Sequence, residues 1–185
     1  MSFSLPQTYL IGLSLLLLAI AIVVGRQILK VRQDEIKLNQ LEKNGINLNK
    51  DVSQLYELAS AQLRKRLYPQ ATSTLKAATK LLDKEPNEVK ALVENALGFA
   101  LAAQDDFKSA IKHYSSAIKA KEEYPVALNN LGFAYQRLLK ENEAYKNYEE
   151  VLKLDPNNKT AISQIKRLER IIGKNKDQLI EKKGF

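Results

Sequence analysis

The sequence predicts an all-α protein: one apolar helix, then an array of paired amphipathic helices, then a closing helix. Residues 1–25 contain no charged side chain. A pattern of two short amphipathic helices recurs three times between residues 51 and 158. We therefore expect four parts, which are an anchor (1–25), a helical stalk with a linker (26–50), three repeats (about 51–85, 88–122 and 125–158), and a capping helix with a basic tail (159–185).

The N-terminal run has the length and composition of a membrane-spanning helix. Tyr9–Val24 is apolar apart from three residues, and with its uncharged flanks it reaches the roughly 20 residues that a bilayer core requires. A cleaved signal peptide would carry positive charge before the run. Here the basic residues Arg26, Lys30 and Arg32 follow it instead. We therefore predict an uncleaved anchor, with everything after Arg26 on the side where synthesis occurs.

The segment after the anchor is predicted to continue the same helix to about Lys43. Apolar residues at heptad spacing give a weak pattern, namely Leu29 with Ile36 and Val31 with Leu38, followed by Leu41. A stalk that lifts the repeats off the surface and a self-association helix are both compatible with this pattern. Asn44-Gly45 is expected to end the helix, with a short polar linker at 45–50.

The repeats are recognised by residues that recur at a fixed distance. Leu97-Gly98-Phe99 aligns with Leu131-Gly132-Phe133, and a weaker copy comes earlier, with Ala59 in the place of Gly98. The interval from Ala59 to Gly98 is longer than that from Gly98 to Gly132, which predicts an insertion around Asp83–Asn87. The expected helices span 51–66, 69–82, 88–103, 107–121, 125–139 and 142–154. Pro69 and Pro125 suit first turns, and Asp106 suits a helix cap.

Small and aromatic residues at equivalent places predict how the helices of each pair pack. Two short helices cannot bury their apolar faces alone, so copies must stack. Small residues let the paired helices approach closely, an aromatic residue recurs four positions after the small residue of the second helix, and proline ends the last pair. The predicted packing residues are Ala59, Ala71, Gly98, Ala110, Tyr114, Gly132, Ala144, Tyr148 and Pro156.

The closing helix is expected from Lys159 to Ile172, ending at Gly173. Its apolar residues share one face, and Lys166, Arg167 and Arg170 share another, as a terminal helix of a stacked array requires. Residues 159–185 carry eight Lys or Arg and three Asp or Glu. These charges could contact anionic lipid or could simply form a solvated face.

The composition argues against an enzyme and against a metal or cofactor site. The 185-residue chain has no Cys, no Trp, one His and a formal net charge of +8. Without cysteine, thiolate metal sites are excluded. His113 has no carboxylate beside it in sequence, so a surface or packing role is expected. No basic stripe interleaved with aromatic residues crosses the repeats, which disfavours nucleic acid as a partner.

The repeat pattern resembles the tetratricopeptide repeat, a protein-binding scaffold. In such a stack the first helices line a groove. The predicted groove residues are Tyr56, Ser60, Asn95, Phe99, Asn129, Phe133 and Arg137. The alternative is that Phe99 and Phe133 only pack between neighbouring repeats. The lysine and asparagine clamp of chaperone-cofactor members is absent, which disfavours a cytosolic chaperone adaptor.

The whole chain is similar to membrane-anchored tetratricopeptide proteins of cyanobacteria and red-algal plastids that are implicated in photosystem I assembly. The runs that carry this resemblance are GRQILKVRQDEIKLNQLE, YELASAQLRKRLYPQA, NALGFAL and ALNNLGFAYQRLLKENEAYKNYEEVLKLDPNNKTA. It implies a single-pass protein of the thylakoid membrane, with its repeats on the cytoplasmic or stromal side and photosystem I subunits or assembly intermediates as partners. A general membrane-tethered adaptor of a secretion, envelope or division complex is the alternative.

Overall fold

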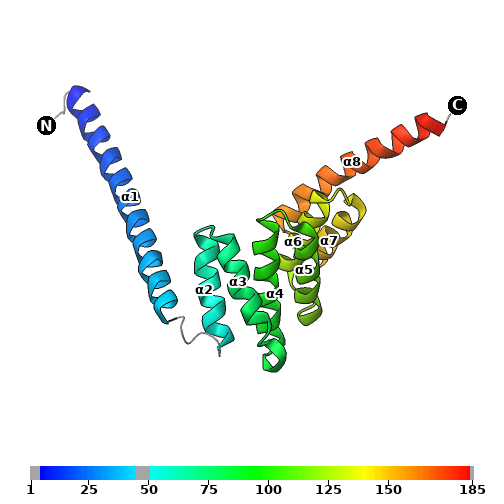
Figure 1. Ribbon diagram of the computed structural model, residues 1–185. Helices are drawn as coiled ribbons and strands as arrows, with labels where there is room; N and C mark the ends of the chain where they lie inside the picture. The colour runs from blue at the N-terminus through cyan, green and yellow to red at the C-terminus, as the bar shows by residue number, and fades with distance from the viewer. Residues whose placement is uncertain (1–4, 45–50, 184–185) are drawn as a thin grey trace. The chain divides into compact units, whose positions relative to one another are not determined.

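The computed structural model describes residues 5–44 and 51–183, and these residues form helices joined by short turns (Figure 1). This confirms the predicted all-α class. The chain divides into two compact units, one of residues 1–46 and one of residues 47–185. The first unit contains the helix α1, and the second contains the helices α2 to α8.

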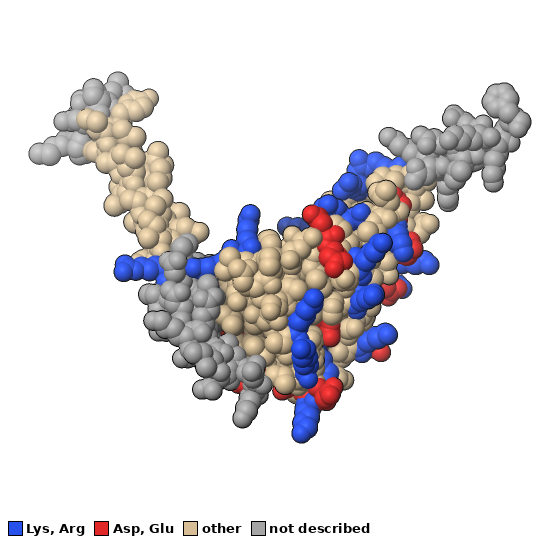
Figure 2. All heavy atoms as spheres, in the orientation of Figure 1, with Lys and Arg blue, Asp and Glu red and all other residues tan. Residues whose placement is uncertain are grey.

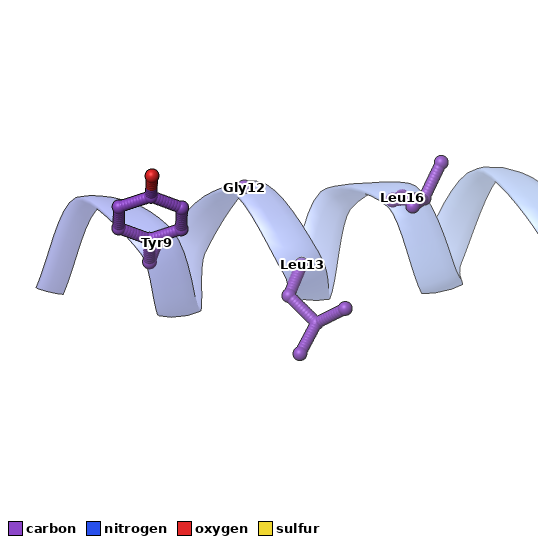
Figure 3. Close-up of a pocket in the computed structure, with 4 residues that line it drawn as sticks. All are labelled: Tyr9, Gly12, Leu13 and Leu16. Atoms are coloured by element: carbon purple, nitrogen blue, oxygen red, sulfur yellow. The ribbon is translucent and has the colours of Figure 1, made fainter. Parts of the chain in front are cut away.

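The predicted anchor and stalk are one continuous helix, α1 (Leu5–Asn44). The end of this helix that the Asn44-Gly45 pair predicts adjoins residues 45–50, which lie outside the described residues. The stretch Tyr9–Leu29 has a mean hydropathy of 2.3, is not buried, and is long and apolar enough to cross a membrane. Figure 3 shows the side chains of Tyr9, Leu13 and Leu16 projecting from this stretch, with Gly12 on the ribbon between them.

Part of the predicted stalk and linker lies outside the described residues. Arg26 and Arg32 are exposed. The linker 45–50 is not described, nor are the side chains of Lys30 and of four of the five residues of the heptad pattern. The two interpretations of the stalk therefore stay predictions.

Three helix pairs follow, and each helix packs on the next. Their bounds lie close to the predicted ones. The pairs are α2 (Val52–Arg64) with α3 (Tyr68–Thr79), α4 (Asn87–Ala102) with α5 (Phe107–Ala120), and α6 (Pro125–Arg137) with α7 (Glu141–Leu154). The first helices also touch one another, α2 with α4 and α4 with α6. The predicted insertion forms the short 3₁₀ turn η2 (Leu82–Lys84) between the first two pairs.

The turn inside each pair places one residue in the left-handed region of backbone space. These residues are Arg66, Asp105 and Leu139, with φ of 58°, 61° and 57°. They occupy equivalent places, because they follow one another at the same intervals as Ala59, Gly98 and Gly132. After the second turn Asp106 caps α5 by accepting a hydrogen bond of 3.1 Å from Ser109 N. Hydrogen bonding by Ser109 lowers the pKa of Asp106 below its usual range.

Close approach between the paired helices depends on glycine. A Cβ atom on Gly98 would lie 2.7 Å from ring carbons of Tyr114, and one on Gly132 would lie 2.9 Å from Cζ of Tyr148. Both tyrosines are buried, and the predicted alanines Ala59, Ala71, Ala110 and Ala144 are fully buried. Pro156 is exposed in the turn after α7, where it contributes to ending the helix and not to packing.

The last helix, α8 (Lys159–Lys183), runs further than predicted. The expected end at Gly173 is wrong, because a glycine inside a helix costs only about 1 kcal/mol and the residues that follow are mostly good helix formers. The N-terminal half of α8 packs on α7 through Ala161 and Leu168, which join Tyr148 and Val151 in one buried cluster. Lys166 follows Gly132 at the interval that separates Gly98 from Gly132, so a charged side chain occupies the place where a further paired helix would have to pack. This supports the predicted capping role.

Candidate partner-binding groove

The first helices of the second and third repeats expose a line of apolar side chains. Leu92 and Phe99 of α4 are 41% and 45% exposed, and Val126 and Phe133 of α6 are 54% and 45% exposed. Each pair is separated by two helical turns, so both members lie on one face of their helix. Each position in α6 is also the repeat equivalent of its counterpart in α4, at the spacing of Gly98 and Gly132. These four residues form what we call the apolar track.

A hollow of about 310 Å³ lies at one end of the apolar track. It is lined by residues of α4, of the turn before α5, of α5 and of α6. The Phe107 and Phe133 rings meet edge to face there, with centroids 6.2 Å apart and planes at 73°. Aromatic pairs favour this geometry because the positive edge of one ring meets the negative face of the other.

Arg137 stands at the rim of this hollow. Its guanidinium carbon lies 4.7 Å from the centroid of the Phe107 ring and 5.9 Å from that of Phe133. Its Nη2 atom lies 3.4 Å from Oδ1 of Asp105. That ion pair is exposed and therefore weak. The site thus combines an aromatic floor with a cation held in a defined place.

Amide side chains continue this surface beyond the hollow. Asn130 lines the hollow, and its Nδ2 donates to Oδ1 of Asn95 at 3.0 Å. Burial raises the pKa of Tyr124, the neighbouring Tyr56 raises it further, and a hydrogen bond with Asn95 opposes both. These contacts bring residues of all three repeats close together.

The structure brings three of the seven predicted groove residues into the hollow. These are Phe99, Phe133 and Arg137, and Asn95 joins them through Asn130. Tyr56 lies near Tyr124, and Ser60 is half-buried on α2. Asn129 instead contacts the turn before α8, where its Nδ2 donates to Oδ1 of Asn158 at 3.3 Å. Its own Oδ1 is buried without a partner among the described residues.

Sequence reasoning missed several residues of this surface. The sequence predicts Phe107 only as the first residue of the second helix, although its ring contacts the guanidinium group of Arg137. Asp105 reaches the hollow through the geometry of the turn before α5. The repeat spacing could have found Leu92 and Val126, because it pairs two exposed apolar residues at equivalent places.

His113 also has a partner that the sequence does not show. Its Nδ1 lies 2.7 Å from Oε2 of Glu94, which links the two helices of the second repeat. This is consistent with the expected packing role. Among the described residues, no group of three His, Cys, Asp or Glu could hold a metal ion.

Comparison with known proteins identifies the repeats. The chain matches the family described as tetratricopeptide repeat at residues 125–158 and a second TPR repeat family at residues 98–138. Proteins of this repeat class are non-enzymatic protein-interaction scaffolds. The prediction that the chain is not an enzyme is therefore confirmed.

Relatives extend the match over most of the chain. The ycf37 protein of Guillardia theta is 32% identical over 168 residues, which cover 91% of this chain and 94% of that protein. The chain belongs to the ycf37 family of tetratricopeptide-repeat proteins. The ycf37 protein of Cyanophora paradoxa is 29% identical over 89% of this chain and 95% of that protein. The chloroplastic tetratricopeptide protein PYG7 of Arabidopsis thaliana is 33% identical over 85% of this chain, which spans about half (52%) of that protein.

Solved structures share the fold of this ycf37-family chain. MamA superposes with a TM-score of 0.67 at 23% identity, over 74% of this chain and 77% of that one. The first tetratricopeptide domain of Spaghetti (RPAP3), bound to an HSP90 peptide, gives a TM-score of 0.59 at 24% identity, over 66% and 95% of the two chains. At these identities the likeness supports the fold alone.

Proposed function

We propose that this ycf37-family protein is a membrane-anchored scaffold that assists the assembly or stability of photosystem I at the thylakoid membrane. Its partners are photosystem I subunits or assembly intermediates, bound by the groove on the cytoplasmic or stromal side. The observation that carries the proposal is the apolar track of Leu92, Phe99, Val126 and Phe133. It is exposed in a chain that also contains an apolar helix long enough to span a bilayer.

The apolar track explains why a partner would bind. Packed side chains of a soluble array should be buried, yet these four remain exposed at equivalent places on two adjacent helices. Exposed apolar side chains gathered on one surface mark an interaction site more often than chance. The alternative that Phe99 and Phe133 only pack between repeats does not account for the exposure of nearly half of each residue.

The proposed mechanism is local concentration. The anchor confines the groove to the plane in which membrane complexes are built. Even a groove of low affinity would then bind its partner, because the effective concentration is high. Reversible binding of an extended segment would hold a subunit until its neighbours join.

The test is co-purification of partners from native membranes. Full-length tagged protein is solubilised gently, and the retained chains are identified by mass spectrometry. We expect photosystem I subunits with the wild type and their loss with the double variant Phe99→Ala and Phe133→Ala. A matched control, Leu154→Ala, removes an apolar residue of similar exposure from α7 and should retain them.

Two results would contradict the proposal. If the double variant, with its helix content intact, retained photosystem I subunits equally, the groove would be excluded as their binding site. Envelope or secretion proteins in place of photosystem I subunits would favour the general membrane-tethered adaptor instead.

A further inference from the structure

The row of side chains that contains Phe99 and Phe133 changes from polar to apolar to cationic along the array. At the repeat spacing, Ser60 precedes Phe99 in the first repeat and Arg167 follows Phe133 in α8. The register extends into α8 because the buried residues Ala127 and Ala134 have buried counterparts, Ala161 and Leu168, at the same spacing. The row is therefore apolar in the middle and cationic at the α8 end, where Arg167 is exposed.

Arg137 adds a second cation, which lines the hollow itself. The Phe107 and Phe133 rings hold its guanidinium group in place and leave its N–H edge for an acceptor. Asp105 is a weak competitor, because the contact is 3.4 Å long and the two side chains are 79% and 52% exposed for Asp105 and Arg137 respectively. A ligand carboxylate that excludes water on binding would form the stronger pair.

The size of the hollow sets the kind of group that enters it. Its 310 Å³ is at the low end of the roughly 300–1,000 Å³ of ligand pockets, so it suits an inserted side chain and not a folded surface. The amide groups of Asn130 and Asn95 lie beside it and can pair with the backbone of an extended segment. An apolar side chain would rest on Phe99 and Phe133, which are the exposed rings of the lining.

We propose that the groove recognises an extended acidic–apolar segment of a partner polypeptide. A Phe, Leu, Ile or Met side chain enters the hollow between Phe99 and Phe133. An Asp or Glu one or two residues away pairs with Arg137, and further acidic residues continue toward Arg167. A lysine or arginine in the place of this Asp or Glu is disfavoured, because it would face the Arg137 cation. This inference rests on the proposed function, since it names the chemistry of the segment that the groove binds.

The test selects peptides on the full-length protein held in detergent micelles. A displayed library of random nonapeptides is the probe. We expect enriched sequences to pair an apolar residue with an Asp or Glu within two positions. A synthetic peptide of that pattern should bind at least tenfold more tightly than its Gln or Asn counterpart.

Single variants test separately the residue that pairs with the acidic group and the residue that contacts the apolar side chain. Arg137→Gln should abolish the tenfold preference for the acidic peptide, while Phe133→Ala should weaken both peptides alike. The matched control Lys140→Gln removes the same charge from a residue outside the hollow, beside the Tyr135 ring, and should keep the preference. Circular dichroism of each variant reports whether its helices are intact.

Three outcomes would overturn the inference. They are the absence of enrichment, enriched peptides without acidic residues, and an acidic preference that survives Arg137→Gln unchanged. None of these affects the proposed function. Loss of photosystem I subunits from the Phe99 and Phe133 double variant would still support a groove that binds its partner by other chemistry.

Discussion

At single positions, the packing of each helix pair depends on side chains of complementary size on the two facing helices. Gly98 faces Tyr114 and Gly132 faces Tyr148 at distances that leave no room for a methyl group. In the first pair Ala59 takes the place of the glycine, and Leu75 takes the equivalent place of the tyrosine. Both are fully buried. The departure of Ala59 from the repeat pattern is thus compensated by a smaller opposing side chain.

Gly132→Ala is expected to destabilise the protein despite the better helix propensity of alanine. Overpacking against the Tyr148 ring costs about 1–3 kcal/mol and the propensity gain returns about 1 kcal/mol, for a net loss of up to about 2 kcal/mol. Urea unfolding measures the difference. Gly173→Ala is the control, because no atom lies within 4 Å of its added Cβ, and it should be neutral or stabilising. Equal effects of the two substitutions would refute this account of the glycine.

Leu139 is a residue whose backbone conformation is unfavourable, so that a substitution by glycine should help. It is 79% exposed and has a φ of 57°. Leu139→Gly should stabilise the protein by about 0.5–1 kcal/mol, because relief of left-handed strain of roughly 1–2 kcal/mol exceeds the added entropy of the unfolded chain. Thermal unfolding measures the shift. The control Lys146→Gly, inside α7, should lower stability. A loss of stability with Leu139→Gly would contradict the strain argument.

At the scale of the element, α8 closes the array because its two faces differ. Leu168 is buried against the third repeat, whereas the nearby Lys166 is exposed in the place where Gly98 and Gly132 admit a partner helix. The sequence predicted this division of the helix correctly. It did not predict the C-terminal extent of α8, because the local signal of Gly173 was outweighed by the helix-forming residues after it.

Leu168→Ala should therefore loosen the C-terminal end of the array. Removal of a fully buried leucine side chain costs about 2–4 kcal/mol, and the loss should appear first in the backbone of α7 and α8. Hydrogen exchange measures it helix by helix. The control Ser163→Ala, at an exposed position of α8, should stay within about 0.5 kcal/mol of the wild type. Uniform loss of protection in α2 to α5 would instead indicate one cooperative unit.

At the scale of the whole molecule, charge and apolar area are separated along the chain. Residues 1–25 carry no charge, and residues 159–185 carry a net charge of +5, from eight basic and three acidic residues. On the face of the array shown in Figure 2, Lys and Arg are interspersed with Asp and Glu and form no continuous basic stripe among the described residues.

The proposed anchor can be tested by placing charge in its centre. Leu16→Lys with Leu18→Lys should release the full-length protein from membranes, because each lysine at mid-bilayer costs about 2.5–3.5 kcal/mol. Extraction with alkaline carbonate measures retention. The control Gln33→Lys adds charge beyond the apolar stretch and should leave retention unchanged. Release of the wild type itself by carbonate would refute a spanning helix.

Periodicity and residue size by themselves determined the helix pairs, the register between repeats and the small residues at which the paired helices approach closely. These features are local or repeat at a fixed spacing, so they can be read along a single chain. The hollow could not be predicted from the sequence, because it depends on tertiary structure. Its lining residues Asp105, Phe107 and Arg137 come from three elements, and their side chains meet only after two repeats stack. The same holds for His113, whose partner Glu94 lies on another helix, and for Asn129, which packing turned toward Asn158. Sequence spacing gives the face on which a side chain lies, and only packing against neighbouring helices decides what that side chain contacts.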